Sequence, residues 1–341
     1  MANLPKIGVD IGSASIKLVE LVPSGRMGWR LTAAITVPSP VARFVDSPTG
    51  QTAMAQSLAK AYKEAGMRAK RVVVALPEEQ ISTHVVEMPA LSEAEVEQAL
   101  KWQVEQYIPI PAEQAIWSYQ VIRKTEGEQG GMEILLAAVA KTTVEGYQKV
   151  IEQAGLEVLA METELMATAR AVVPPGAPLA LIVDIGAKST DLGIVDRGML
   201  VFSRTIPTAG EAFTRAIESA LGVDSAQAEQ FKNSYGFSKQ LMEGKLGEIM
   251  RPVLSIIASE IRKTGDFYLS KHGGDAVKEV VLAGGVAALP DVVGILSGAL
   301  GLEVVVGDPF SRVELDKKQR QVLGAGAPLY AVSVGLAMRE T

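Results

Sequence analysis

One short segment occurs twice in this chain, and this repetition limits the possible folds more than any other feature of the sequence. Residues Lys6–Leu18 and Ala180–Leu192 align at a constant offset, and both contain Val-Asp-Ile-Gly followed by a matching serine and leucine. In each copy an apolar run leads into the aspartate, a glycine and small residues follow, and alternating apolar residues lead away. This pattern predicts two β-hairpins with glycine turns, each opening one half of the protein. The simplest account is a pair of similar α/β lobes that face each other.

Composition excludes several classes of function. The chain has 341 residues, of which 48% are hydrophobic, so we expect two to three packed units with ample core. The net charge is −6 and no block of five like charges occurs, which disfavours a nucleic-acid groove. The sequence has no cysteine and only two histidines, His84 and His272, and neither lies in a nucleophile elbow or a metal-ligand spacing. We therefore expect no nucleic-acid partner, no thiolate site and no histidine-dependent hydrolase.

One apolar stretch, Val280–Leu302, is long enough to cross a bilayer and carries a single charge, Asp291. Glycines and Pro290 divide it, however, in the manner of a strand, a turn and a helix, so a buried α/β core is the better interpretation. The first ten residues lack the features of a signal peptide. We expect a cytoplasmic protein without direct membrane insertion.

The segment 86–157 differs from the sequence around it in the order of its predicted strands and helices. A strand at Val85–Met88 is followed by Ser92 and Glu95, which form a capping box and predict a helix to about Tyr107. Two further strands and a helix follow at 115–123, 133–140 and 143–154. This order predicts a small α+β subdomain inserted in the first lobe.

The complete division follows from these segments. We expect lobe one at 1–85 plus 158–178, with a helix at 54–66 and a strand at 71–76. The proline-rich linker 174–178 then leads to lobe two at 179–222 plus 275–341, whose last helix returns to lobe one. The mainly helical segment 223–274 is predicted to be an insertion in lobe two.

An Asp-x-Gly sequence at a hairpin turn suits phosphate chemistry. Glycine lets backbone N–H groups approach a phosphate closely, and the adjacent carboxylate can reach Mg²⁺ through water. Each Asp-x-Gly alone is weak evidence, because ordinary β-turns favour the same residues. Two such hairpins facing each other would hold a triphosphate from both sides.

A third motif, Leu282–Pro290, places the pair Gly284 and Gly285 at the end of a buried strand, where a ribose or a flat ring could approach the backbone. With the two hairpins, and in this order, it resembles the ATPase superfamily of actin, Hsp70 and the sugar kinases. No P-loop or Rossmann glycine motif competes with it. The resemblance implies an actin-like, ribonuclease H-like duplicated two-lobe α/β ATPase fold that binds ATP and Mg²⁺.

Within that superfamily the chain is similar to the FtsA and PilM families. The segments Glu105–Pro111, Trp117–Tyr119 and Val183–Asp191 resemble the PilM family of type IV pilus assembly in particular. This resemblance implies a cytoplasmic scaffold, peripheral at the inner membrane, that binds the N-terminal tail of a PilN-like membrane protein. It also implies contacts with other pilus platform proteins and motor ATPases, and it leaves a homo-oligomer open. The chain stops at Thr341 without the linker and amphipathic helix of FtsA, so anchoring of the FtsA type is not expected.

The resemblance also assigns roles to individual residues. Asp10 and Asp184 would lie beside Mg²⁺, and Lys17 would approach the β- or γ-phosphate. Lys188 and Asp191 would lie near the γ-phosphate, but no water-positioning residue can be chosen from spacing. The remaining phosphate contacts are expected from backbone groups of Gly12, Ser13, Ala14, Gly186 and Ala187.

Three further residues, Gly210, Glu229 and Lys232, match positions that contact the ribose and adenine in the superfamily. For Glu229 and Lys232, an ordinary ion pair three residues apart on a helix is the alternative. Trp102 falls nearly opposite the apolar stripe of the capped helix, so it either packs under a neighbouring subdomain or contacts a partner.

Three functions remain open from the sequence. The first is an ATP-binding scaffold whose nucleotide state modulates partner binding, with slow ATP turnover or none. The others are an FtsA-like polymer that depends on nucleotide and a sugar-kinase-like phosphotransferase.

Overall fold

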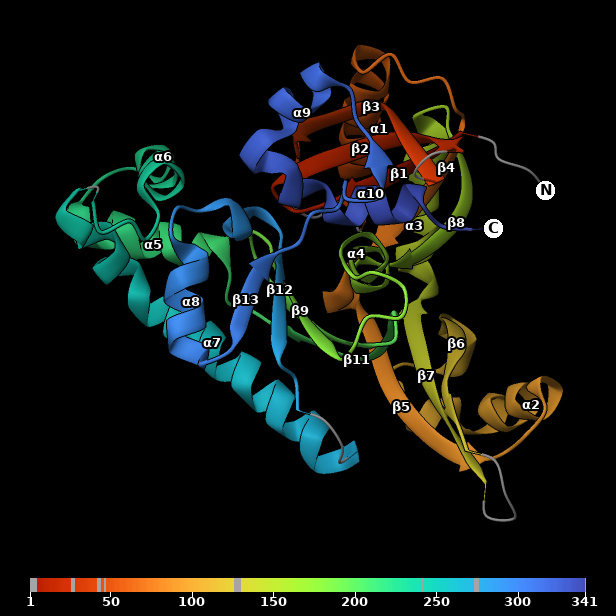
Figure 1. Ribbon diagram of the computed structural model, residues 1–341. Coiled ribbons are helices and arrows are strands. Elements are labelled where there is room, and N and C mark those ends of the chain that lie inside the picture. Colours follow the sequence, from red (N-terminus) through yellow and green to blue (C-terminus); the bar gives the residue numbers. More distant parts are fainter. Residues whose placement is uncertain are drawn as a thin grey trace.

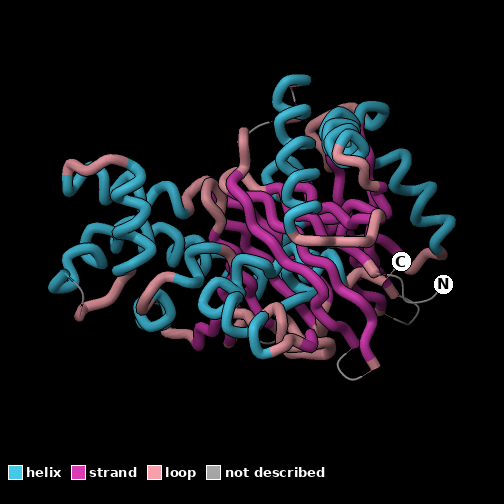
Figure 2. Tube along the Cα trace, turned by 90° about the horizontal axis from the view of Figure 1, so that it is seen from above, coloured by secondary structure: helices cyan, strands magenta, loops and turns pink. Residues whose placement is uncertain are grey.

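Three β-sheets organise the chain in this computed structural model, which describes residues 5–25, 28–41, 44–45, 47–125, 130–240, 242–272 and 276–340, without the side chains of residues 102 and 103. The two larger sheets have strand orders β14-β3-β2-β1-β4-β8 and β11-β10-β9-β12-β13, and the small sheet has the order β5-β7-β6. Figure 1 shows the large sheets on either side of a pair of central helices, with the small sheet projecting to one side. In the perpendicular view the strands form a central band with helices around it (Figure 2). The predicted actin-like α/β fold is therefore confirmed in its architecture.

The six-stranded sheet forms the first lobe. Its strands are β1 (Lys6–Ile11), β2 (Ser15–Ser24), β3 (Gly28–Pro38), β4 (Arg71–Leu76), β8 (Glu157–Thr163) and the short β14 (Val313–Glu314). Helices α1 (Pro48–Glu64) and α3 (Lys141–Gln153) bury apolar residues such as Leu58 and Ile151 with those of β1 and β4. The short α9 (Lys317–Leu323) contributes Leu323 to a separate cluster beside β2 and β3.

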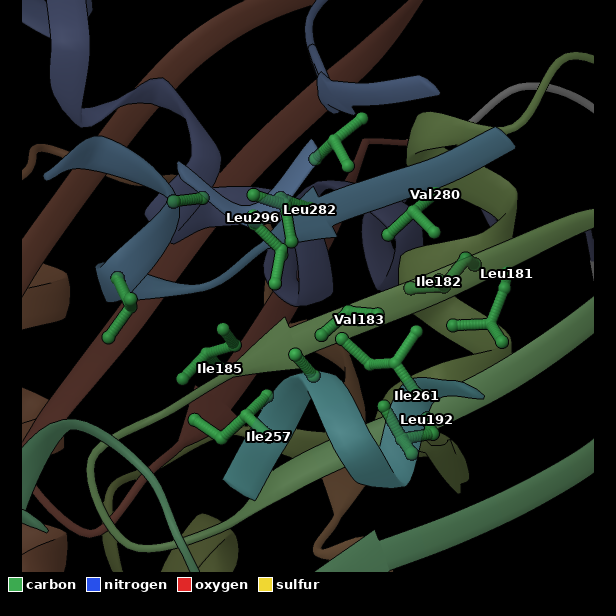
Figure 3. Packing of buried hydrophobic residues seen from close by; sticks show 14 of the residues in the cluster. Leu181, Ile182, Val183, Ile185, Leu192, Ile257, Ile261, Val280, Leu282 and Leu296 are labelled. Atoms are coloured by element: carbon green, nitrogen blue, oxygen red, sulfur yellow. The ribbon is translucent and has the colours of Figure 1, made fainter. Parts of the chain in front are cut away.

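The five-stranded sheet forms the second lobe. Its strands are β9 (Ala180–Ile185), β10 (Thr190–Asp196), β11 (Met199–Ile206), β12 (Glu279–Ala283) and β13 (Glu303–Val306). Figure 3 shows the apolar core of this lobe, in which Ile257 and Ile261 of α7 (Lys245–His272) lie near Leu192 of β10. The helices α5 (Gly210–Leu221), α6 (Ser225–Tyr235) and α8 (Val292–Leu300) complete the lobe.

The small sheet consists of β5 (Ile81–Pro89), β6 (Ala115–Lys124) and β7 (Gly131–Ala140). Helix α2 (Glu93–Gln103) packs Val96 and Leu100 into its apolar cluster. The capping box is confirmed, because the backbone N–H of Ser92 donates to Glu95 Oε2 at 2.8 Å. After α2 the chain continues as a 3-10 turn to Gln106, so the regular helix is shorter than the sequence predicted.

Two other elements differ from the prediction. Helix α1 begins at Pro48 rather than near residue 54, because Ser47 accepts a hydrogen bond from the N–H of Gly50 and proline is well suited to the first helical position. Helix α3, which the sequence analysis grouped with the small sheet, packs in the first-lobe core against α1. The division of the chain into subdomains stays a prediction, and these contacts describe only how its elements pack.

Helices α4 (Glu164–Val172) and α10 (Ala331–Ala337) lie between the two large sheets. Helix α10 packs on β1 and on α4, and α4 also contacts β9, β10 and β11 of the second lobe. The contacts are very close: a Cβ added to Gly8 of β1 would lie 1.9 Å from the carbonyl oxygen of Ser333, and one added to Gly335 would lie 1.8 Å from that of Ala167. Glycine at these two positions therefore allows the layers to meet backbone to backbone.

Replacing either glycine with alanine should destabilise the protein strongly. Because the obstructing atoms are backbone carbonyls, the helices must move apart, and overpacking of this kind costs about 1–3 kcal/mol or more. We expect Gly335→Ala to lower the thermal unfolding midpoint by several degrees in calorimetry. The matched control is Gly294→Ala on α8, where a Cβ would meet nothing within 4 Å and alanine should stabilise the helix by about 1 kcal/mol. Equal midpoints for the two variants would contradict this account of the packing.

Candidate functional site

A cavity of about 930 Å³ lies between the two lobes. Both hairpin turns, the end of β12 and the facing parts of α5 and α6 line it. All the residues that the sequence analysis assigned to nucleotide or metal line this one cavity: Asp10, Gly12, Ser13, Ala14, Lys17, Asp184, Gly186, Ala187, Lys188, Gly210, Glu229, Lys232, Gly284 and Gly285. Segments far apart in the sequence thus meet at one place, while the role of each residue stays a prediction.

The two hairpin turns have the same local geometry. In the first, the N–H of Gly12 donates to the carbonyl of Ser15 at 3.0 Å, and in the second the N–H of Gly186 donates to that of Ser189 at the same distance. Asp10 pairs with Lys17 across β1 and β2, and Asp184 pairs with Asp191 across β9 and β10. The sequence repeat is therefore a repeat in structure.

The charges of the two hairpins differ at one equivalent position. Lys17 Nζ lies 2.9 Å from Asp10 Oδ2, so the first hairpin carries an ion pair. Although burial opposes it, the Asp10 carboxylate raises the pKa of Lys17. The second hairpin has two facing carboxylates instead. Burial, followed by the nearby charges of Asp191 and Asp10, raises the pKa of Asp184 to about 7.

Further carboxylates surround this pair. Asp191 is buried and accepts hydrogen bonds from Thr205 Oγ1 at 2.6 Å and Ser189 Oγ at 3.2 Å, and burial raises its pKa to about 6. Glu164, at the first position of α4, also lines the cavity, and burial raises its pKa well above the ordinary value, with Asp191, Asp10 and Asp184 adding to the shift. Asp184, Asp191 and Glu164 therefore form a group of three buried carboxyl groups, while Lys17 pairs with Asp10 on the first hairpin.

The geometry of these carboxylates suits a hydrated cation better than a directly ligated one. Among the described residues, no three acidic or histidine side chains converge closely enough to form a metal cage. Mg²⁺ keeps much of its water and takes one or two carboxylates, so Asp10 and Asp184 fit it without such a cage. A cation bound there would favour the ionised form of Asp184, whose pKa burial and the neighbouring carboxylates raise.

Two glycines bring backbone segments together at the cavity. Gly284 has φ of +79°, and a Cβ there would lie 2.4 Å from Asp184 Oδ1. Gly210 donates its N–H to the carbonyl of Gly186 at 3.0 Å, and Glu211 donates to Ala187 at 2.8 Å, which fixes the start of α5 on the second turn. Glycine at these positions lets β12 and α5 approach the turn that carries Asp184.

Glu229 and Lys232 are not an isolated surface pair. Lys232 Nζ lies 2.5 Å from Glu229 Oε2 and donates to Thr214 Oγ1 and to the carbonyl of Gly210, at 2.9 and 3.2 Å. Lys232 is only 5% exposed, while the Glu229 side chain is about half exposed at the cavity. The pair therefore links α6 to α5, and it leaves a carboxylate edge accessible to a ligand.

The sequence analysis missed Glu164. It follows Thr163, whose hydroxyl accepts a hydrogen bond from the N–H of Met166 at 3.1 Å and so caps α4. A strand followed by a threonine and an acidic residue could have predicted the position of Glu164. This order marks the start of a helix, here at the end of a strand parallel to β4. Trp102, predicted to bind a partner, has a side chain that lies outside the described residues.

A second cavity of about 860 Å³, which we call the groove, lies between the edge strands β8 and β6. Apolar residues such as Ile116, Trp117 and Met161 line it, and three guanidinium groups lie at one end: Arg170, Arg312 and Arg339. Glu162 holds two of these, with Arg170 Nη1 at 2.5 Å and Arg339 Nη1 at 2.6 Å. An edge strand offers backbone groups to an added extended peptide, so both sides of the groove suit that kind of ligand.

This duplicated architecture, with a cavity between two Asp-x-Gly hairpins, defines an actin-like ATPase fold. The chain is similar to the ethanolamine utilization protein EutJ from Carboxydothermus hydrogenoformans, with a TM-score of 0.61 and 18% identity over 99% of this chain and 91% of that one. MreB5 of Spiroplasma citri bound to AMPPNP gives a TM-score of 0.53 with 16% identity over 97% and 94%. At these identities the likeness shows the fold alone.

The family is narrower than the fold. A family model described as type IV pilus assembly protein PilM matches residues 8–341, so the chain belongs to the PilM family of pilus assembly proteins. A solved PilM-PilN type IV pilus biogenesis complex contains a chain that is 27% identical, with a TM-score of 0.85 and 98% of both chains covered.

The cell division protein FtsA is a more distant relative. The Streptococcus pneumoniae FtsA is 25% identical over 87% of this chain and 74% of its own length. The Pseudomonas aeruginosa FtsA is 25% identical over 68% of this chain, which spans 63% of that protein's length. None of the described helices combines the length and the apolar character that crossing a membrane requires.

The raised pKa of Asp184 predicts a pH dependence of stability. An acid whose pKa rises on folding stabilises the native state below its unfolded pKa, near 4, and this stabilisation is lost as the pH rises through about 7. When the pH is raised from 5 to 8 without Mg²⁺ or nucleotide, the thermal unfolding midpoint of the wild type should therefore fall by several degrees relative to that of Asp184→Asn. Asp266→Asn, at an exposed position on α7, is the control and should follow the wild type. Parallel curves for the wild type and Asp184→Asn would refute the prediction.

Proposed function

We propose that this protein is an ATP-binding, actin-like scaffold of the type IV pilus inner-membrane assembly platform. It binds the N-terminal cytoplasmic tail of a PilN-like membrane protein, and its nucleotide state modulates that binding. The observation that carries the proposal is the convergence of both hairpin turns and the Gly284–Gly285 pair on one cavity of about 930 Å³. Ligand cavities commonly have volumes of about 300–1,000 Å³.

In this proposal the two turns hold the phosphates. The backbone groups of residues 12–14 approach from the first lobe and those of residues 186–187 from the second, while Lys17 supplies a positive charge beside Asp10. Asp10 and Asp184 orient the water ligands of Mg²⁺, which when bound neutralises phosphate and carboxylate charge. The sugar and base lie toward Gly210, Glu229, Lys232 and the Gly284–Gly285 pair.

Binding, rather than rapid turnover, is the proposed activity. Lys188 and Asp191 lie at the second turn, where a terminal phosphate would lie, and Glu164 faces the same part of the cavity. These groups are compatible with slow hydrolysis, and the scaffold role requires none. Structures of MreB5 of Spiroplasma citri bound to AMPPNP and to ADP support the proposal that this fold binds a nucleotide. Their sequence identity to this chain is 16% and 17%.

The groove is the proposed site for the partner's tail. The support is the likeness to the PilM-PilN complex, together with a groove between two sheet edges that would hold an extended peptide. Binding of this tail would hold the protein at the inner membrane from its cytoplasmic side. The proposal includes three further contacts that the sequence analysis named. These are a partner contact at Trp102, binding to other pilus platform proteins and motor ATPases, and a homo-oligomer.

An FtsA-like polymer is the second candidate, and the FtsA relatives favour it. Sedimentation in the presence and absence of Mg-ATP tests it, because a polymer that depends on nucleotide pellets only with Mg-ATP. A sugar-kinase-like phosphotransferase would instead transfer phosphate from ATP to a small acceptor, which a screen of acceptors would reveal.

The nucleotide site is tested by calorimetry of ATP and ADP binding with Mg²⁺. We expect the wild type to bind and Asp10→Ala and Asp184→Ala to weaken binding by at least about tenfold, equivalent to about 1.4 kcal/mol, because each variant loses a carboxylate that positions Mg²⁺. Asp266→Ala, on the exposed face of α7, should bind like the wild type. If the folded wild type binds neither nucleotide, the proposed nucleotide site is wrong, and the protein is a scaffold that has the actin-like fold but does not bind ATP or ADP.

The partner site is tested by titrating a synthetic peptide with the tail sequence of the organism's own PilN. Ile116 lines the groove and is 43% exposed, so Ile116→Asp should weaken the peptide's affinity at least about tenfold with little effect on folding. Val322→Asp on α9, where the native side chain is 76% exposed and outside the groove, is the matched control. If both variants bind the peptide as the wild type does, the tail does not lie over Ile116.

A further inference from the structure

The cavity and the groove share a wall. One segment, residues 76–81, places Leu76 and Ile81 in the groove but Pro77, Glu79 and Gln80 in the cavity. A second segment, residues 163–166, places Thr163 and Met166 in the groove but Glu164 in the cavity. We call these two segments the partition, because each has residues that line the groove and residues that line the cavity.

Reciprocal hydrogen bonds join the two segments of the partition. The N–H of Glu78 donates to Glu164 Oε2 at 3.2 Å, and the N–H of Leu165 donates to Glu78 Oε1 at 3.0 Å. Glu78 thus caps the N-terminus of α4 from a different part of the chain, where a carboxylate also interacts favourably with the helix dipole. Since Glu78 is only 5% exposed, removing its carboxylate would leave the N–H of Leu165 without this buried partner.

The cavity side of the partition faces the groups that would surround a nucleotide. Glu164 lies in the electrostatic field of Asp10, Asp184 and Asp191, so an anionic phosphate or a cation beside them changes the forces on its carboxylate. The same carboxylate holds the N–H of Glu78. A change of position on the cavity side is therefore imposed on the segment that carries Ile81.

The groove side of the partition is connected to α4 and to the small sheet. Met166 lies one turn or less from Glu164 on α4, and Ile81 begins β5, the strand that enters the small sheet. Helix α4 contacts sheets of both lobes, and Figure 1 shows it at the centre of the molecule. A peptide that presses on Met166 therefore acts on the helix whose first residue, Glu164, lies in the cavity. A peptide that presses on Ile81 acts on the segment that is hydrogen-bonded to the start of this helix.

We propose that the partition couples the two sites, with Glu78 as the positioning residue that makes nucleotide binding and tail binding interdependent. This inference rests on the proposed function, because it requires both ligands. Coupling between sites is reciprocal, so nucleotide changes the affinity for the tail by the same factor as the tail changes the affinity for nucleotide.

The test is a four-way measurement of affinities on the full chain. Calorimetry gives the dissociation constant of the synthetic PilN tail peptide with and without saturating Mg-AMPPNP, and that of Mg-AMPPNP with and without the peptide. For the wild type we expect both ratios to be equal and to differ from one by at least about fivefold, the lower end of usual coupling. Glu78→Ala removes the hydrogen bond from the N–H of Leu165 but keeps the backbone N–H that donates to Glu164 Oε2, so we expect both ratios to move toward one by at least about twofold.

Two matched variants separate coupling from general damage. Glu78→Gln keeps a side-chain oxygen that can accept from the N–H of Leu165, so it should retain most of the coupling. Asp266→Ala removes an exposed carboxylate on α7 that lines neither the cavity nor the groove, and it should leave the ratio as in the wild type. Hydrogen exchange on the wild type needs no variant. Adding the peptide alone should change amide exchange in residues 78–80 and 164–166, and adding Mg-AMPPNP alone should change it in the same residues.

The outcomes distinguish the inference from the proposed function. If the wild type binds only one ligand or neither, the proposed function fails and the inference fails with it. If both ligands bind but the wild-type ratios equal one, nucleotide does not modulate tail binding, so that part of the proposed function fails together with the inference. If the wild type shows coupling but folded Glu78→Ala keeps all of it, the inference alone is overturned. If Glu78→Ala does not fold, exchange that each ligand changes only at its own site overturns it.

Discussion

The structure depends on the close approach of backbone at its central layer. Helix α10 can lie against β1 only because Gly8 has no side chain, and it can lie against α4 only because Gly335 has none. Packing at this distance gives many dispersion contacts and little freedom to shift, since interiors are packed about as densely as organic crystals. Both large sheets meet α4, so this layer sets how far apart the two hairpin turns lie.

With the positions of the turns fixed, a difference at one equivalent residue of the two hairpins determines the charges between the turns. Lys17 and Asp191 occupy equivalent places in the repeat, each directly opposite the aspartate of its own hairpin. The first hairpin is therefore neutralised internally, and the second is left with carboxylates whose pKa values rise. A duplicated fold thus has one hairpin whose charges are paired and one hairpin whose two carboxyl groups face each other.

Much of this arrangement could be predicted from the sequence, because it rests on local signals. The repeat around Asp10 and Asp184 predicted both hairpins, and Ser92 with Glu95 predicted the start of α2. Contacts between distant segments gave no such signal. The packing of α3 on α1 and the capping of α4 by Glu78 depend on residues that lie far apart in sequence, and period or propensity does not encode them.

The small sheet has a mechanical consequence. Its chain leaves and re-enters the first lobe, yet Ile122 and Leu135 belong to the apolar cluster of the second lobe, and Thr83 Oγ1 lies 2.7 Å from Ser203 Oγ of β11. Separation of the lobes along this edge would expose those side chains to water, whereas rotation about it would not. Separation of the two lobes is therefore opposed at the small sheet as well as at α4 and α10.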